Sequence, residues 1–253
     1  MNALYGILAK HPRLQEHPKT VSLVAECGVN WNNLSEAKTM IKSAWWSGAT
    51  HAKFQAYGED ALKEGSRRIA NHLKKVMLTK ETAQELKGCA EDLGLTWFAT
   101  PTSVERVDFL EDLGVSLYKI REKDSENIDL LKRVFLTKKP MFVSSQRLPG
   151  SLDLLYHPMI KWLYCIPKYP PALSEIRLSE NIGVFDGYSN HYPDIAIPYA
   201  AACLGARVLE VHVTLDHGRP DLDAPVSIDF LELFRLSHML CLLEQLPEAR
   251  PIG

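Results

Sequence analysis

Short runs of apolar and β-branched residues alternate with longer stretches of helical periodicity about eight times along the chain of 253 residues. The short runs have the length and composition of buried strands. We expect eight strands, at residues 21–25, 51–55, 95–99, 116–120, 140–144, 161–165, 184–191 and 208–214. Because a helical pattern follows each run, the strands are expected to be parallel.

The helical stretches share a 3.6-residue period, and several end at a glycine. They occupy residues 34–48, 60–75, 80–93, 103–113, 125–136, 149–158, 173–180, 195–205 and 227–246. A single-domain α/β fold of the (β/α)8 TIM-barrel class explains this alternation best, and such barrels typically need about 250 residues. The alternative is an open, doubly wound sheet, but no Gly-x-Gly-x-x-Gly or Walker sequence follows a predicted strand. We expect residues 1–19 to be an N-terminal extension and residues 20–253 to be the barrel.

Charge and composition exclude several classes of partner. The formal net charge is -2, so the chain lacks the basic footprint of a protein that binds nucleic acid or anionic membranes. No apolar run approaches the length of a membrane span, and residues 1–10 lack the basic leader and cleavage site of a signal peptide. The five cysteines are widely scattered without a Cys-x-x-Cys pair, which is typical of reduced thiols in a cytoplasmic protein.

Two histidines occupy equivalent positions on successive predicted strands. His191 follows the seventh apolar run, and His212 lies near the end of the eighth. The carboxyl ends of parallel strands meet on one face, where α/β proteins build their sites. Two imidazoles brought together there suit a divalent metal ion. The alternative is two ordinary histidines, one hydrogen-bonded in the core and one on the surface.

Other polar residues are expected at the same mouth of the barrel. Lys53 and Lys119 each interrupt an apolar strand, which is costly unless the cation is paired or used. Pairing with a carboxylate on a neighbouring strand would make either lysine structural. The residues expected at strand exits are Glu26, Asn30, Lys53, Gln55, Thr100, Lys119, Asp124, Ser144, Ser145, Tyr169, Ser189, His191, Glu210 and His212.

Several of these residues lie in motifs with a familiar order. The motifs are Ala25-Glu26-Cys27-Gly28-Val29-Asn30, Lys53-Phe54-Gln55, Phe98-Ala99-Thr100-Pro101, Tyr118-Lys119-Ile120, Tyr169-Pro170, Gly187-Tyr188-Ser189-Asn190-His191 and Leu209-Glu210-Val211-His212-Val213-Thr214-Leu215-Asp216. Over residues 20–245 the chain resembles the catalytic barrel of the sialic acid synthase (N-acetylneuraminate synthase) family. That family includes legionaminate and pseudaminate synthases and related spore-coat polysaccharide proteins.

The resemblance implies a reaction and a set of roles. Family members condense phosphoenolpyruvate with an N-acyl amino sugar, giving a sialic-acid-like 2-keto sugar acid and phosphate. His191 and His212 would bind a divalent metal, Mn or Mg, that acts as a Lewis acid on the sugar aldehyde and helps to orient the attacking water. The resemblance further implies that Glu26, Lys53, Lys119 and Asp124 are catalytic, with Glu26 and Asp124 as the acid–base pair. The substrate-binding residues would be Asn30, Gln55, Thr100, Ser144, Ser145, Tyr169, Ser189, Glu210 and Asp223, of which Thr100, Ser144 and Ser189 hold phosphoenolpyruvate with the two lysines and Asp223 contacts the sugar.

The sequence also departs from the family pattern. The usual Gly-Ser-Gly-Glu after the fourth strand, a small cradle whose backbone amides can bind phosphate, is Arg121-Glu122-Lys123-Asp124. Ser-Thr-Gly is replaced by Ser144-Ser145-Gln146, Cys-Thr-Ser/Asn by Cys165-Ile166-Pro167, Asn-His-Asn-Gly by Asn30-Trp31-Asn32-Asn33, and Ser-Asp-His by Ser189-Asn190-His191. Family members usually continue into an antifreeze-like domain that closes the partner subunit's site, and no segment of this sequence is expected to form one.

Three functional hypotheses therefore stand. The first is an active synthase with an altered acceptor, in which Arg121, Lys123 or Arg147 replaces lost phosphate contacts. The second is a non-catalytic relative that binds a sugar or a partner protein. The third is a Schiff-base aldolase or lyase that uses Lys119 or Lys168. The first hypothesis gives a role to the largest number of these residues. We expect it to work as a homodimer, with a second copy or a separate antifreeze-like lid chain covering the mouth.

Overall fold

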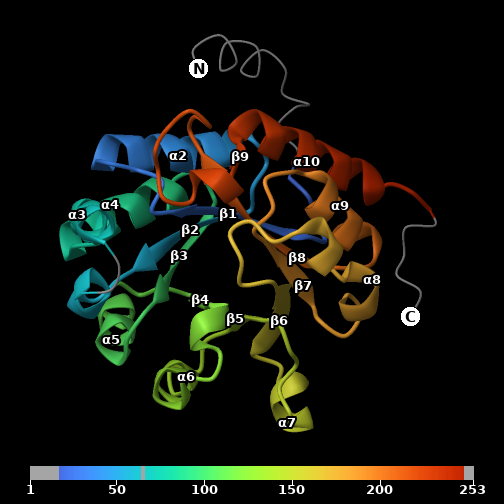
Figure 1. The fold of residues 1–253 in the computed structure, drawn as a ribbon, viewed down its shortest axis with the longest axis horizontal. Helices are drawn as coiled ribbons and strands as arrows, with labels where there is room; N and C mark the ends of the chain where they lie inside the picture. The colour runs from blue at the N-terminus through green and yellow to red at the C-terminus, as the bar shows by residue number, and fades with distance from the viewer. Residues whose placement is uncertain (1–16, 64–65, 248–253) are drawn as a thin grey trace.

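Eight parallel strands form a nearly closed barrel, and helices surround it (Figure 1). The computed structural model describes residues 17–63 and 66–247. The strands are β1 (Ser22–Gly28), β2 (His51–Ala56), β3 (Thr96–Pro101), β4 (Tyr118–Ile120), β5 (Met141–Ser145), β6 (Ile160–Cys165), β7 (Gly187–Asn190) and β8 (Val208–Thr214). Their order is β3-β2-β1-β8-β7-β6-β5-β4, and β3 and β4 lie in contact at the seam. The predicted single-domain (β/α)8 barrel is confirmed.

The helices lie outside the strands and alternate with them along the chain. The α-helices are α2 (Leu34–Trp46), α3 (Arg67–Val76), α4 (Lys80–Glu91), α5 (Val104–Asp112), α6 (Ile128–Phe135), α7 (Leu152–Leu155), α8 (Leu178–Asn181), α9 (Ala196–Cys203) and α10 (Phe230–Leu243). Short 3-10 helices are η2 (Glu59–Lys63), η3 (Glu122–Asp124), η4 (Leu173–Glu175) and η5 (Ala224–Val226). None of the helices within the described ranges is long and apolar enough to cross a membrane.

Several predicted elements differ from the structure. The helix expected at 173–180 is two short helices, η4 and α8, and the one expected at 149–158 is helical only over Leu152–Leu155. The single helix expected at 60–75 is wrong: η2 is followed by a separate helix, α3, that begins after the capping side chain of Ser66. The closing helix begins at Phe230 rather than 227, because Ile228–Asp229 pair with β8 as an extra strand, β9. The seventh strand begins at Gly187 rather than 184, because Phe185 still bonds back to Asn181 after α8.

Most of the predicted N-terminal extension lies outside the residues that the structure describes. Residues 1–16 of the predicted extension at 1–19 lie outside the described ranges. His17 Nδ1 lies 2.9 Å from the carbonyl oxygen of Ala49, and the backbone N–H of Lys19 donates to Glu244 Oε2 at 2.9 Å. The chain that enters β1 is thus tied to the end of α10 and to the turn before β2.

The barrel interior is layered, because alternate residues of a strand point to the same side. One buried apolar cluster consists of a single residue from each of five strands together with Leu117, which directly precedes β4. Its members are Val24, Phe98, Leu117, Phe142, Leu163 and Val208. Two residues further along the same strands come Glu26, Thr100, Lys119, Ser144, Cys165 and Glu210, all of which line one cavity. The polar site therefore lies on an apolar floor at the carboxyl end of the barrel.

Gly187 shows how tightly the strands approach at this floor. A Cβ built on Gly187 would lie 2.2 Å from the carbonyl oxygen of Val208 and 2.8 Å from Leu163 Cδ2. No side chain fits such a gap without displacing backbone, so glycine is required there. The close packing of β6, β7 and β8 sets the spacing of the residues that follow on these strands.

Candidate active site

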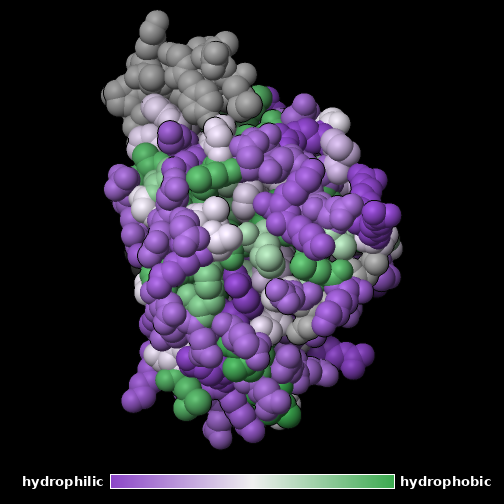
Figure 2. All heavy atoms as spheres, turned by 90° about the vertical axis from the view of Figure 1, so that its left-hand side faces the viewer, coloured by the Kyte–Doolittle hydropathy of each residue, from purple (hydrophilic) through white to green (hydrophobic). Residues whose placement is uncertain are grey.

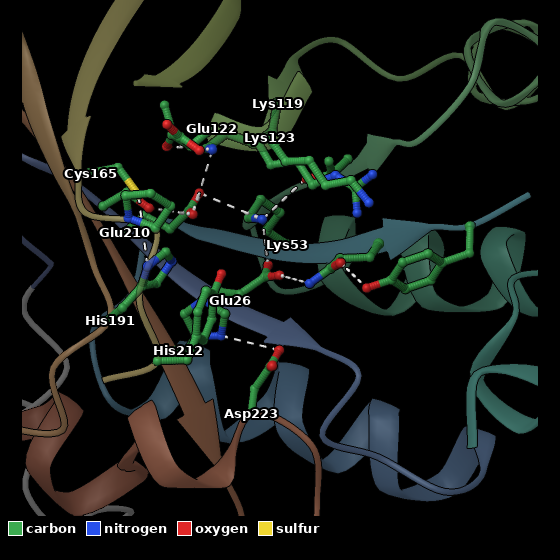
Figure 3. Close-up of a pocket in the computed structure, with 18 residues that line it drawn as sticks. Glu26, Lys53, Lys119, Glu122, Lys123, Cys165, His191, Glu210, His212 and Asp223 are labelled. Atoms are coloured by element: carbon green, nitrogen blue, oxygen red, sulfur yellow. Dashed lines mark hydrogen bonds and ion pairs between the residues drawn. The ribbon is translucent and has the colours of Figure 1, made fainter. Parts of the chain in front are cut away.

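A cavity of about 310 Å³ opens at the carboxyl ends of the strands (Figure 3). Charged and hydrogen-bonding side chains dominate its lining. The lining residues are Glu26, Lys53, Gln55, Tyr57, Thr100, Lys119, Arg121, Glu122, Lys123, Ser144, Cys165, Pro167, Tyr169, Ser189, His191, Glu210, His212 and Asp223.

Two lysines and two glutamates form the centre of the cavity. Lys53 Nζ lies 2.8 Å from Glu26 Oε2 and 3.6 Å from Glu210 Oε2. Lys119 Nζ lies 3.7 Å from Glu210 Oε1, so Glu210 is placed between the two cations. All four residues are at most 4% exposed. The two lysines that interrupt apolar strands are therefore balanced by carboxylates and also line the cavity.

Burial and charge act in opposite directions on these groups. Burial raises the pKa of Glu210, but Lys119 and Lys53 outweigh it and lower this pKa to about 2. Burial lowers the pKa of Lys53, but Glu210 and Glu26 outweigh it and raise this pKa above its ordinary value. Burial dominates at Lys119 and lowers its pKa, although Glu210 opposes the shift. Burial likewise raises the pKa of Glu26, against the attraction of Lys53.

Hydroxyl and amide groups orient the charged side chains. Lys119 Nζ donates to Ser144 Oγ at 2.7 Å, and Lys53 Nζ donates to Thr100 Oγ1 at 3.2 Å. Ser189 Oγ donates to Glu210 Oε1 at 2.9 Å. On the other side of the cavity, Gln55 Nε2 donates to Glu26 Oε1 at 2.8 Å, and the Tyr57 hydroxyl donates to Gln55 Oε1. These hydrogen bonds fix the orientation of each charged side chain before any ligand enters.

The two histidines meet at one end of the cavity, as their matched strand ends predict. Their ring centroids are 5.2 Å apart, and the Tyr169 ring stacks on His191 at 4.1 Å. His191 Nδ1 lies 2.8 Å from the carbonyl oxygen of Ile166, an arrangement in which Nδ1–H donates and Nε2 keeps its lone pair. Burial, followed by the charge of His212, lowers the pKa of His191 to about 3, which keeps this imidazole neutral.

The chemistry of the donor set suits a divalent ion. His212 Nδ1 is buried and makes no hydrogen bond, although Asp223 Oδ2 lies 3.4 Å away. Burial lowers the pKa of His212, but the Asp223 carboxylate outweighs it and raises this pKa. The contact with Asp223 is long, and a buried imidazole nitrogen of this kind is a group that a metal ion can satisfy. Two imidazoles beside a carboxylate are ligands that divalent metal ions accept in proteins.

Three predicted site residues do not line the cavity. Asp124 turns back along η3 and forms an ion pair with Arg121. Ser145 bonds to the backbone of Arg147 beyond the strand end. Asn30 is buried behind the wall, where its side-chain amide donates to Val213 O at 3.0 Å and its carbonyl accepts the N–H of Asp223. Asn30 is thus placed to hold the loop that carries Asp223 rather than to touch a ligand.

The structure also brings residues into the cavity that the strand-exit rule did not select. Tyr57 lies just past the end of β2, and Cys165 and Pro167 lie at and beyond the end of β6. Glu122 and Lys123 reach the cavity from η3 (Figure 3), and Arg121 lines it from the position before η3. For Arg121 and Lys123 the signal was a run of charge directly after a buried strand. The sequence offered no indication for Tyr57, because a tyrosine after a strand is as typical of a packed core residue as of a binding site.

Comparisons with known proteins agree with this geometry. The model of the NeuB family matches residues 40–246. Human N-acetylneuraminate-9-phosphate synthase is 30% identical over 258 residues, which cover 91% of this chain and 71% of the human protein. The N,N'-diacetyllegionaminic acid synthase of Campylobacter jejuni is 29% identical, with 88% and 75% covered. The crystal structure of the N-acetylneuraminic acid (sialic acid) synthetase of Leptospira borgpetersenii in complex with citrate matches with a TM-score of 0.81 at 26% identity, covering 93% of this chain and 89% of that chain. The chain therefore belongs to the NeuB family.

Proposed function

We propose that this protein condenses phosphoenolpyruvate with an N-acyl amino sugar to form a sialic-acid-like 2-keto sugar acid, assisted by a divalent metal ion. The observation that carries the proposal is the convergence of two buried lysines and two facing histidines on one cavity. The synthase names of the relatives support the same reaction class.

Phosphoenolpyruvate would bind at the lysine end of the cavity. It carries a phosphate and a carboxylate, and two separate cations suit a ligand with two anionic ends. Lys53 Nζ donates to Glu26 and Thr100, and Lys119 Nζ donates to Ser144 and to the carbonyl oxygen of Ile120. Since an ammonium group has three N–H donors, each lysine has one left to offer a ligand. Thr100, Ser144 and Ser189 add hydroxyl groups beside them.

Side chains at the entrance would replace the small phosphate cradle of the family. Arg121 and Lys123 line the same cavity as Lys119, and both stand at positions where the resemblance implies glycine. The Arg121 side chain is 30% exposed, lines the cavity and is paired with Asp124, so it would meet a ligand at the mouth while it keeps that partner. Arg147 does not line the cavity, so it is not part of the proposal.

The sugar would bind at the histidine end. His191 and His212 would hold the metal, with the Asp223 carboxylate next to His212. When bound, the metal supplies a Lewis acid for the aldehyde oxygen of the open-chain sugar and helps to orient a water molecule. Asp223 and Gln55 are placed to accept and donate hydrogen bonds to sugar hydroxyls. Tyr169 covers His191 and limits the space on that side.

The reaction makes one carbon–carbon bond and, at C2 of phosphoenolpyruvate, forms a carbon–oxygen bond to water and breaks the one to phosphate. C3 of phosphoenolpyruvate attacks the aldehyde carbon, and the aldehyde oxygen becomes a hydroxyl by taking a proton. Water then adds to C2, and inorganic phosphate leaves with the bridging oxygen. Glu26 lies between Lys53 and Gln55, and burial raises its pKa, so it suits the acceptor of the proton from water.

Phosphate release under defined omissions tests this function. The protein is mixed with Mn²⁺, phosphoenolpyruvate and a panel of N-acyl hexosamines. Release that needs both the sugar and phosphoenolpyruvate supports the synthase. Thermal stabilisation by ligands without any phosphate release would instead indicate a non-catalytic sugar-binding relative.

One observation favours a second candidate, a Schiff-base aldolase or lyase. Burial lowers the pKa of Lys119, which lines the cavity and is 1% exposed. Lys168, the other lysine considered, is exposed and forms an ion pair with Glu175 outside the cavity. Borohydride reduction in the presence of a 2-keto sugar acid would trap a product on Lys119 only if this mechanism operates.

A cover over the mouth is part of the proposal. Water in an open site weakens every electrostatic contact there. Tyr169 lines the cavity and is 55% exposed, so it would offer apolar surface to a second copy of the chain or to a separate antifreeze-like lid chain. We propose a homodimer as the working form, which light scattering over a concentration series would detect.

A further inference from the structure

A second cavity lies outside the barrel mouth, between α3 and the loop after β8. Its volume is about 550 Å³, and its walls are strongly basic. The residues that line it are Asn32, Arg67, Arg68, Asn71, His72, Lys75, Arg219, Pro220, Asp221 and Leu222. None of them lines the central cavity. We call this second cavity the α3 groove.

Helix α3 is built to present cations to this groove. Arg67, Asn71 and Lys75 are spaced four residues apart and therefore share one face of the helix. Leu73 and Val76 are buried and hold the opposite side against the protein. Figure 2 shows the side of the molecule that bears α3, where hydrophilic residues cover most of the surface and apolar residues appear only in scattered patches.

The cations of the groove differ in how they are paired. Arg219 is neutralised by Glu36 at 2.7 Å and by Asp221 at 2.8 Å. Arg68 donates to the backbone carbonyl of Pro220 at 3.1 Å and forms no ion pair with the residues that the structure describes. Arg67 and Lys75 form no ion pair within residues 17–63 and 66–247. The groove thus holds uncompensated positive charge with amide donors from Asn32 and Asn71 beside it.

The groove shares a wall with the central cavity. Asp221 and Leu222 line the groove, whereas the next residue, Asp223, lines the central cavity. His72 Nε2 lies 2.6 Å from the carbonyl oxygen of Val29, so α3 also touches the loop that leaves β1. An anion in the groove would therefore bind directly behind the loop that carries Asp223.

We propose that the α3 groove binds an anionic group of the phosphate class. Guanidinium groups and a lysine around a polar concavity are the donors that phosphate prefers. The phosphate could be free or could be a substituent of the sugar acceptor, and the second source rests on the proposed function. In both cases the anion bridges α3 and the loop of Asp223 and fixes that loop at the mouth.

Calorimetry on the full chain tests the groove. The probes are inorganic phosphate, an N-acyl hexosamine and the 6-phosphate of the same hexosamine. The test variant is Arg67→Gln/Lys75→Gln. The matched control is Lys74→Gln, which removes an exposed charge from the same helix at a position that does not line the groove. We expect the double variant to lose at least tenfold in affinity for the phosphate probes and the control to stay within twofold of the wild type.

The two sources give different patterns. Equal affinity for inorganic phosphate and the sugar phosphate indicates a site for free phosphate. Tighter binding of the sugar phosphate than of either other probe indicates an acceptor substituent.

A Lys119→Met variant distinguishes binding in the groove from binding in the central cavity. Phosphate that binds in the groove should bind this variant as it binds the wild type. The proposal is overturned if no phosphate probe binds, if only Lys119→Met reduces binding, or if Lys74→Gln loses as much as the double variant. Failure of the synthase reaction alone would leave groove binding intact.

Discussion

Glu26 and Lys53 are direct partners in the parallel pairing of β1 with β2, and their charged atoms lie 2.8 Å apart inside the barrel. The strand register therefore builds this ion pair before any substrate is present. A buried pair of this kind contributes little net stability, but loss of one partner leaves an uncompensated charge.

The first prediction concerns that pair. Glu26→Gln and Lys53→Met should each lower the free energy of unfolding by about 3 kcal/mol or more, because one buried charge remains. The double variant should cost clearly less than the sum of the two. Urea unfolding measures all three, and Lys161→Met, at an exposed ion pair with Asp186, is the control and should cost about 1 kcal/mol or less. Additive losses would show that Glu26 and Lys53 do not act as a unit.

The second prediction concerns Lys119. Lys119→Met should weaken phosphoenolpyruvate binding at least tenfold in calorimetry, because a buried cation at the anion end of the cavity is lost. Lys168→Met is the matched control, since this exposed lysine pairs with Glu175 outside the cavity. Equal affinity in wild type and Lys119→Met would make Lys119 structural.

The fold was largely predictable from the sequence, and the site was predictable where it follows strand geometry. Glu26, Lys53, Lys119, Glu210 and the two histidines converge because residues at strand ends share one face. Asp124, Ser145 and Asn30 were expected in the cavity but bond to neighbouring groups instead. The direction of a side chain in a loop or 3-10 helix depends on local bonds that spacing does not encode.

Some boundaries were beyond sequence reasoning for a similar reason. Residues 60–75 carry one helical pattern, yet Ser66 caps a new helix within it. Ile228 pairs with Val213 at a strand end, a tertiary contact between residues that are adjacent only in the folded chain. Local propensity cannot anticipate such pairings.

The third prediction concerns the ring stack on the metal pair. Tyr169 stacks on His191 at 4.1 Å and also meets the edge of His212. Tyr169→Ala should reduce the affinity for Mn²⁺ by roughly tenfold, because the orientation of the imidazoles is no longer fixed. Tyr169→Phe keeps the ring and should bind Mn²⁺ as the wild type does. Metal titration followed by electron paramagnetic resonance gives both values, and equal losses in the two variants would assign the effect to the hydroxyl.

The fourth prediction concerns acid stability and a histidine at the opposite end of the barrel. Burial lowers the pKa of His51 to about 4, and its ring lies edge-on to Phe98 and Phe142. The unfolded chain binds a proton at His51 below about pH 6.5, whereas the folded chain resists it. The contribution of neutral His51 to the free energy of unfolding is thus complete above pH 6.5. It is lost as the pH falls towards 4, and the loss reaches up to about 3 kcal/mol.

Chemical denaturation between pH 7 and pH 4 measures this effect. His51→Phe should show a correspondingly smaller loss of stability than the wild type. His238→Gln, an exposed histidine stacked on Phe234 of α10, is the control and should follow the wild type. A loss in His51→Phe as large as in the wild type would assign the acid sensitivity to other groups.

The stoichiometry of the reaction tests the central claim most directly. With Mn²⁺, phosphoenolpyruvate and an accepted N-acyl hexosamine, we predict one inorganic phosphate for each molecule of a new sugar acid. Its mass should equal the sum of the sugar, phosphoenolpyruvate and water less phosphoric acid. His212→Ala and Lys119→Met should reduce both products together by about a hundredfold or more, since each removes a group that binds a reacting centre. Phosphate release without a sugar acid, or product formation that survives in His212→Ala and Lys119→Met, would contradict the proposed synthase.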